Sequence, residues 1–347
     1  MKKTILFAFT ALLGGLLAAC LPKPQTPANP VPETPVESSP TIQAVEPQMS
    51  QTAQPSRTDT PAPSITAMET TTPDPTVTEP FLPPTPIVSN TPQSTTTPSA
   101  DWKLVWADEF NQVDGSPVNA KNWSFETGGG GWGNNELECY TDRTANASVQ
   151  NGALVIKATP ENYLGCAYTS ARLVTKGKAD WTYGRFEIKA KLPQSKGLWP
   201  AIWMLPTDNA YGGWPDSGEI DIMELLGDKP YKIYGTLHYG SPHTSQGGEY
   251  DLPGSSATGG ASFADDFHVF SLEWEPQEMR WFVDGFLYFS THVWNTSGPK
   301  GDFPAPFNRR FHLVLNVAVG GSWPGSPDET TTWPQSMTVD YVRVYKK

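Results

Sequence analysis

The segment Glu219-Ile-Asp-Ile-Met-Glu224 constrains the fold more than any other part of this 347-residue chain. It places three carboxylates among apolar residues, and a charged group in a sheet is costly unless it is paired or faces a solvated cleft. Glu219 and Asp221 are two residues apart, so they share one face of a β-strand. Glu224 reaches that face only if a β-bulge adds one residue near Ile222 or Met223. The segment therefore predicts a bulged strand with three acids on one surface.

Two other interpretations of this segment are an exposed acidic strand edge and a cation site. A solvated edge would not need the apolar residues between and after the acids. A Ca²⁺ site more often takes its oxygens from a turn-forming loop. Hydrolysis of a glycosidic bond, in contrast, requires two carboxyl groups on opposite sides of that bond. The pattern therefore favours a glycosidase site.

Tryptophan is abundant around the acidic segment. All thirteen Trp residues lie after position 100, and Trp199, Trp203 and Trp214 precede the acids closely. Trp offers a large aromatic face on which the apolar face of a sugar ring stacks. Trp199 and Trp203 are four residues apart and would share one face of a strand. A core role is the alternative for each single Trp, but the cluster favours a sugar-binding cleft.

The rest of residues 101–347 reads as short β-rich runs separated by turns, without a capped helical period. Asp284-Gly285 between two such runs is a strong hairpin signal. Pattern alone thus predicts an all-β fold, an antiparallel two-sheet β-sandwich. A single domain of this size is ordinary for such folds. The strand-like runs are 153–158, 184–191, 268–274, 279–289, 311–319 and 338–345.

The order of several motifs identifies residues 101–347 as similar to glycoside hydrolase family 16, in particular to its bacterial laminarinase (endo-1,3-β-glucanase) branch. The bulged acidic motif with Met223 is typical of laminarinases, agarases and carrageenases, whereas lichenases and xyloglucan-active relatives lack the extra residue. The segments that carry the resemblance are WADEF (106–110), GNNE (133–136), SARL (170–173), YGRFE (183–187), WPAIW (199–203), GEIDIME (218–224), GTLH (235–238), NVAVGGSWPG (316–325) and DYVRVY (340–345).

The resemblance implies a curved jelly roll whose concave face is the substrate cleft, and retaining endo-hydrolysis of β-1,3-glucosidic bonds. It implies that Glu219 is the nucleophile, Glu224 the general acid/base, and Asp221 the acid between them. No cofactor is expected for catalysis. The residues that the resemblance places in sugar subsites are Asn134, Arg172, Trp199, Trp203, Trp214, His238 and Trp323.

His238 lies five residues before His243, a spacing that raises the question of a metal site. The connection through Gly240 and Pro242 and the absence of a nearby Cys argue against zinc. A hydrogen bond to a sugar or to the catalytic acid is the favoured role of His238.

The family often carries a structural Ca²⁺, and the matching positions here are Glu109, Asp340 and the backbone oxygen of Gly152. These are oxygen ligands, as Ca²⁺ prefers. Surface carboxylates that cap turns are the alternative, so the ion remains an expectation.

The substrate class is bounded by charge. The formal net charge is −12 and no basic cluster occurs, which argues against nucleic acid and disfavours a sulfated polymer such as carrageenan. A neutral β-1,3-glucan fits best, with mixed-linkage glucan or agarose as alternative polymers. A glucan-binding module without activity is a further alternative, which the presence of all three acids disfavours.

The first hundred residues differ from the rest. Residues 1–19 form a signal peptide, and Leu17-Ala-Ala-Cys20 resembles a bacterial lipobox, which implies cleavage and lipidation at Cys20. Residues 20–100 are rich in Pro and Thr, and from Leu21 on they lack Trp, Tyr, Gly and Cys, so we expect a disordered linker. A plain secretory signal is the alternative. We therefore expect an exported monomeric lipoprotein, held to a membrane on the cell surface or facing the periplasm.

Two further cysteines, Cys139 and Cys166, lie in the predicted folded part. In an exported protein such a pair favours a disulfide, and two buried free thiols are the alternative.

Overall fold

The computed structural model describes residues 101–257, 259–294 and 301–347. The described residues contain seventeen strands and no helix. Accordingly, no helix in them is long and apolar enough to cross a bilayer. The strands are β1 Lys103–Asp108, β2 Ser124–Glu126, β3 Glu138–Tyr140, β4 Ala147–Gln150, β5 Ala153–Tyr163, β6 Cys166–Ser170, β7 Arg172–Val174, β8 Gly184–Lys191, β9 Leu198–Pro206, β10 Glu219–Leu225, β11 Lys232–Tyr239, β12 Thr244–Asp251, β13 His268–Glu275, β14 Glu278–Val283, β15 Phe286–Thr291, β16 Phe311–Val319 and β17 Gln335–Lys346.

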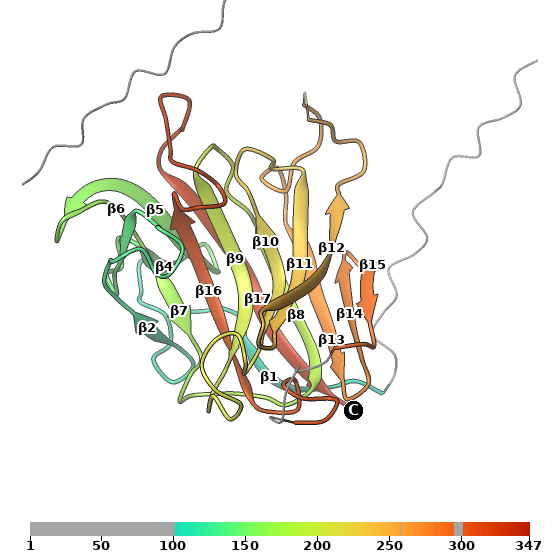
Figure 1. Cartoon of the computed structure of the whole chain (residues 1–347). Coiled ribbons are helices and arrows are strands. Elements are labelled where there is room, and N and C mark those ends of the chain that lie inside the picture. The colour runs from blue at the N-terminus through green and yellow to red at the C-terminus, as the bar shows by residue number, and fades with distance from the viewer. Residues whose placement is uncertain (1–100, 258, 295–300) are drawn as a thin grey trace, which may run out of the picture. The chain divides into compact units, whose positions relative to one another are not determined.

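The strands form two sheets that face each other (Figure 1). Among the described residues, the smaller sheet has seven strands in the order β12-β11-β10-β9-β16-β7-β2. The larger has ten strands, eight of them in the order β15-β14-β13-β8-β17-β5-β6-β3, with β1 paired to β17 and β4 to β5. Neighbouring strands are antiparallel except β3 and β6, which run parallel. The predicted all-β sandwich is therefore confirmed.

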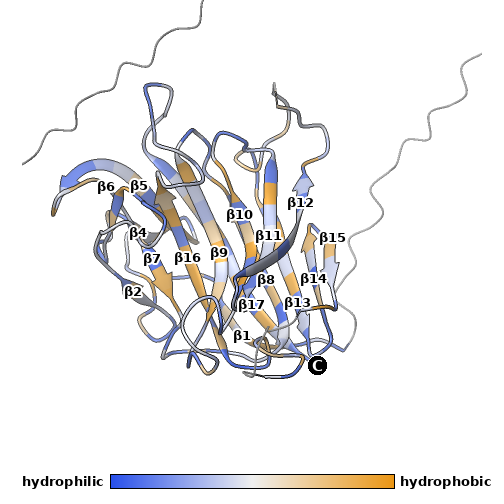
Figure 2. Ribbon diagram, in the orientation of Figure 1, coloured by the Kyte–Doolittle hydropathy of each residue, from blue (hydrophilic) through white to orange (hydrophobic). Residues whose placement is uncertain are grey.

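The core lies between the sheets, where the inward-facing apolar residues of the two sheets meet. β11 and β14 alternate strictly between buried and half-buried positions, as expected for strands with one face inside. β16 is buried along its whole length and lies inside the smaller sheet, between β9 and β7. Figure 2 shows the hydrophobic residues concentrated on the strands and the polar ones on the connections. The largest buried side chains are aromatic, among them Trp123, Trp274, Trp281, Trp294 and Phe311.

The predicted hairpin is present. β14 and β15 pair directly, and Asp284 and Gly285 between them have φ angles of 49° and 79°. Positive φ at both central residues is what a two-residue hairpin turn requires, and Asp-Gly adopts it readily.

The predicted disulfide between Cys139 and Cys166 is also present. It joins β3 to β6, the two strands that end the order of the larger sheet. The signal peptide expected at residues 1–19 and the linker expected at 20–100 lie outside the described residues.

Candidate active site

Strand β10 carries the bulge that the sequence predicts. Asp221 pairs with Thr236 of β11, and Glu224 pairs with Tyr234, so three steps on β10 match two on its neighbour. The pairing with β9 shifts at the same place. One extra residue restores Glu224 to the face of the other acids, while Ile222 and Met223 stay buried.

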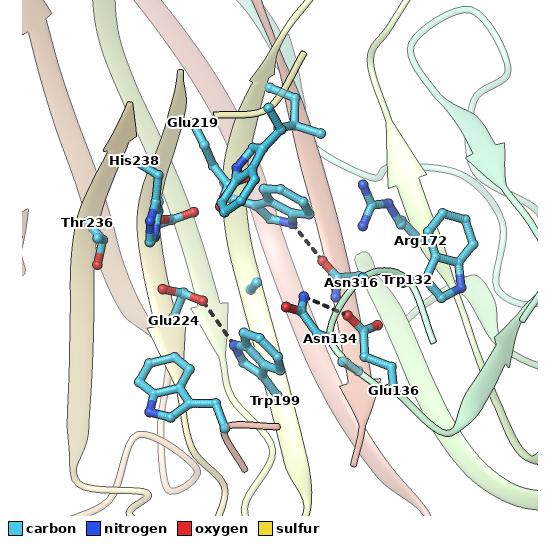
Figure 3. Close-up of a pocket in the computed structure, with 18 residues that line it drawn as sticks. Trp132, Asn134, Glu136, Arg172, Trp199, Glu219, Glu224, Thr236, His238 and Asn316 are labelled. Atoms are coloured by element: carbon cyan, nitrogen blue, oxygen red, sulfur yellow. Dashed lines mark hydrogen bonds and ion pairs between the residues drawn. The ribbon is translucent and has the colours of Figure 1, made fainter. Parts of the chain in front are cut away.

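A pocket of about 660 Å³ lies over the smaller sheet, and the three acids line it (Figure 3). The seven residues expected in sugar subsites also line this pocket, so the fold brings all ten candidates together. Sequence reasoning did not propose the other lining residues, which are Trp132, Gly133, Glu136, Ala201, Leu205, Thr236, Asn316 and Ala318.

Two tryptophans hold the catalytic candidates from opposite sides. The Trp199 indole N–H donates to Oε1 of Glu224 at 3.0 Å, and the Trp214 indole N–H donates to Oε2 of Glu219 at 2.9 Å. Trp214 is 59% exposed and Trp323 42%, so neither is a core residue. Their exposed rings are available as stacking platforms for sugars.

The three carboxyl groups hold protons more tightly than free acids do. Burial raises the pKa of Glu224 to about 8, helped by the negative charge of Asp221. Burial alone raises the pKa of Asp221 to about 8. Burial, followed by the charges of Asp221 and Glu224, also raises the pKa of Glu219. Burial therefore raises the three pKa values more than the neighbouring charges do, and the cluster retains protons at neutral pH.

Asp221 is the most buried member of the cluster. Its side chain is 3% exposed, and its Oδ2 lies 3.3 Å from Nε2 of His238. Glu219 is more exposed and receives the Trp214 hydrogen bond. The Trp214 hydrogen bond favours the charged form of Glu219 and acts against its burial.

An arginine lies between two aromatic rings at the other end of the pocket. The Arg172 guanidinium lies 4.9 Å from the ring centre of Trp132 and 4.6 Å from that of Trp203. Its Nε also donates to Glu126 at 2.7 Å. These contacts fix a planar cationic surface beside the sugar path.

A chain of hydrogen bonds supports the end of the pocket at which Arg172 lies. The Trp203 indole N–H donates to Asn316 Oδ1 at 2.7 Å, and Asn316 Nδ2 donates to the Tyr140 hydroxyl at 3.0 Å. Tyr140 donates to Glu136 at 2.9 Å, and Asn134 donates to the other oxygen of Glu136 at 3.2 Å. Two pocket residues, Asn134 and Trp203, thereby share one buried support.

Some of the pocket residues that were not predicted could have been found from local sequence patterns, and others could not. Glu136 and Asn316 belong to the motifs that carry the family resemblance, and Thr236 precedes His238 by two residues on β11. The strand period of two therefore could have added Thr236 to the site. The link between Tyr140 and Asn316 spans 176 residues, and no local pattern predicts it.

The residues expected to bind Ca²⁺ lie around β17. β1 and β5 both pair with β17, which places Glu109 and Gly152 near Asp340. Both oxygens of Glu109 accept hydrogen bonds from Arg343 at 2.8 Å, and Asp340 pairs with Lys189 at 2.8 Å. A calcium ion at this set would have to displace Arg343 from Glu109 and Lys189 from Asp340.

The sequence profile of "Glycosyl hydrolases family 16" matches residues 132–343. A second profile, "Beta-glucan synthesis-associated protein SKN1/KRE6/Sbg1", matches residues 34–215 and ends before β10.

Curated relatives and solved structures agree with the first profile. The chain is 47% identical to a beta-glucanase of Rhodothermus marinus, over 71% of this chain and 85% of the relative. It is 43% identical to a glucan endo-1,3-beta-glucosidase of Cryptopygus antarcticus, over 70% and 91%. The crystal structure of the laminarinase catalytic domain of Thermotoga maritima is 44% identical, with a TM-score of 0.61 and coverage of 71% and 99%. The chain belongs to glycosyl hydrolases family 16.

Proposed function

We propose that the protein is a retaining endo-1,3-β-glucanase that hydrolyses laminarin-type glucans. The observation that carries this function is the bulge of β10, which puts Glu219, Asp221 and Glu224 into one tryptophan-lined pocket. The glucanases and laminarinases among the relatives supply the substrate class. The three acids disfavour the alternative of a glucan-binding module without activity.

In the first step, Glu219 attacks the anomeric carbon while Glu224 donates its proton to the leaving glycosidic oxygen. A covalent glucosyl-enzyme forms, and the chain on the leaving side departs with a free hydroxyl. In the second step, Glu224 takes a proton from a water molecule that attacks the same carbon, and Glu219 is released. The raised pKa of Glu224, about 8, suits a group that starts as an acid.

Replacement of each acid by its amide tests these roles, because Gln matches Glu in shape. Glu224→Gln is expected to lower kcat on laminarin by about 100- to 10,000-fold, and Glu219→Gln to remove measurable activity. Asp221→Asn is expected to be severe but less complete. The matched control is Glu329→Gln, an exposed position outside the pocket. If either Glu219→Gln or Glu224→Gln keeps activity within about tenfold of the parent, the proposed catalytic roles are contradicted, because loss of an acid/base group should cost at least about 100-fold.

The stereochemistry and the polymer are tested separately. NMR of the first-formed product is expected to show the β-anomer, and an initial α-anomer excludes the nucleophile mechanism. Product analysis on laminarin, lichenan and agarose distinguishes β-1,3-glucan from the alternative polymers. Laminarin is expected to be cleaved fastest, into oligosaccharides of several lengths.

We also propose that the mature protein is a monomeric membrane lipoprotein anchored at Cys20, with residues 20–100 as a spacer. The support is the Leu17-Ala-Ala-Cys20 motif and the Pro/Thr-rich composition that follows it. A structural Ca²⁺ at Glu109, Gly152 and Asp340 remains a proposal from family resemblance alone. Thermal unfolding in CaCl₂ and in EDTA tests it, and an unchanged Tm contradicts it.

A further inference from the structure

We propose that Glu219, Asp221 and His238 form a binding site for a divalent transition-metal ion such as Zn²⁺, and that the bound ion inhibits the enzyme. The proposal goes beyond the hydrolytic function, since the ion would take no part in the reaction.

The three side chains converge from two neighbouring strands. Glu219 of β10 pairs directly with His238 of β11 (Figure 3). Asp221 follows Glu219 by two residues and shares its face of the strand. One ligand atom from each lies within 4.8 Å of the others. Zinc bonds of about 2.0–2.2 Å place two ligand atoms at most about 4.4 Å apart, so small side-chain rotations close the site. One imidazole and two carboxylates are a ligand set that Zn²⁺ accepts, with a coordination position left open.

A buried oxygen within this cluster lacks a hydrogen bond. In the described part of the chain, Oδ2 of Asp221 accepts none, although the side chain is almost fully buried. The nearest polar atom recorded for it is Nε2 of His238, 3.3 Å away. Buried acceptors without a partner are rare, and this one is aimed at the space that a metal ion would occupy.

His243 supplies the support that a metal-binding histidine commonly has. Its Nε2 lies 3.0 Å from Nδ1 of His238, the nitrogen that faces away from the acids. With Nε2 of His238 on the metal, Nδ1 carries the proton and donates it to His243. The Trp214 ring lies 4.9 Å from the His243 ring and holds it in place. His243 itself does not line the pocket.

A metal ion at this position would compete with the substrate. It would bind the Glu219 oxygen needed for attack on the anomeric carbon, and it would occupy space inside the sugar pocket. Mg²⁺ should not replace Zn²⁺, because it prefers octahedral oxygen ligands and keeps its water molecules.

The first test measures inhibition of the full-length protein by ZnCl₂ across a range of laminarin concentrations. Competitive inhibition is expected, with no effect of MgCl₂ at the same concentration. His243→Phe keeps an aromatic ring against Trp214 but removes the acceptor, so the zinc inhibition constant should rise about 10- to 100-fold. His292→Phe, at an exposed site elsewhere, is the matched control and should leave that constant unchanged. If His243→Phe and His292→Phe have the same zinc inhibition constant, the proposal is overturned.

The second test is isothermal titration calorimetry with ZnCl₂, which needs no enzymatic activity. The parent is expected to bind one ion, and Glu219→Gln to lose that binding. Zinc binding to Glu219→Gln with the parent's affinity overturns the site. Since this measurement does not use glucan, its failure is distinguishable from failure of the glucanase assignment.

Discussion

Glu224 holds its proton because it is buried and lies near the negative charge of Asp221, and these two effects outweigh the hydrogen bond from Trp199, which favours the charged form. In the proposed mechanism Glu224 is the general acid, which works only while protonated, so its pKa of about 8 would set an upper pH limit for the reaction. We expect kcat on laminarin to fall as the pH rises through about 8. A glucoside with a dinitrophenolate leaving group needs no proton, so formation of its glucosyl-enzyme should keep its rate above that pH. Loss of both rates at the same pH contradicts the assignment of this limit to Glu224.

Glu138 is a second buried acid, outside the catalytic cluster. Burial and the neighbouring Glu136 raise its pKa from 4.5 to about 9, and its Oε2 accepts the backbone N–H of Val319 at 2.6 Å. The folded protein therefore binds a proton here that the unfolded chain releases above about pH 4.5. The stabilisation is fully present below that pH and is lost as the pH rises toward 9.

Glu138→Gln mimics the protonated acid and cannot titrate. We expect the free energy of unfolding of the parent, relative to this variant, to fall between pH 5 and pH 8.5. Urea denaturation at the two pH values measures the difference. An equal difference at both values shows that Glu138 is not the titrating group.

The strands differ in how well their own residues predict them. β8 and β16 have the predicted bounds because each is a continuous β-rich run with a buried face. β12 was not predicted, since it is a polar edge strand without apolar alternation, stabilised by its pairing with β11. β5 extends past Pro160, where pairing with β6 overrides the local signal. The β10 bulge was predictable because the acids themselves show the break in period.

The residues of the pocket, like the strands, could be predicted only where local sequence carries the signal. Residues that share a strand or a motif were found together, as Glu219 and Asp221 were. The support of Trp203 by Asn316, Tyr140 and Glu136 was missed, because it joins strands that meet only in the folded chain.

The Cys139–Cys166 disulfide lies directly beneath the glycine-rich loop that leads to Trp132 and Asn134. A Cβ on Gly129 would lie 2.7 Å from the sulfur of Cys166 and 3.0 Å from that of Cys139, so only glycine fits there. The loop thus rests on the bridge, and it carries two residues that line the pocket.

Replacement of both cysteines by alanine removes a cross-link between residues 27 apart. We expect a loss of about 3–4 kcal/mol in the free energy of unfolding. The loosened loop should raise KM for laminarin while kcat changes little, since the β10 acids do not contact it. Thermal unfolding and steady-state kinetics measure both effects. An unchanged KM would show that the bridge serves stability alone.

The molecule as a whole combines an acidic folded part with an N-terminal segment of different composition. The charge of −12 suits a neutral polymer, and the spacer would let the cleft reach it away from a membrane. Cleavage at the cell surface would keep the released oligosaccharides close to the cell.

Cys20→Ser tests this arrangement in a bacterial host. The parent is expected in the detergent phase with membranes, because a lipoprotein Cys with more than one acyl chain binds stably. The variant is expected to be released or incorrectly processed. Recovery of the parent wholly in the culture medium, with an unmodified N-terminus, contradicts the anchor.

The bulge in β10 also allows a single strand to carry all three acids of the pocket. Glu219 and Glu224, the proposed nucleophile and acid/base, both lie on β10, and the Trp281 indole N–H donates to the carbonyl of Asp221 at 2.8 Å, which ties that strand to the opposite sheet. The other residues that line the pocket come instead from several strands and loops. Loops around the cleft can therefore be exchanged, by evolution or by engineering, to accept a new polymer while the reacting groups keep their places.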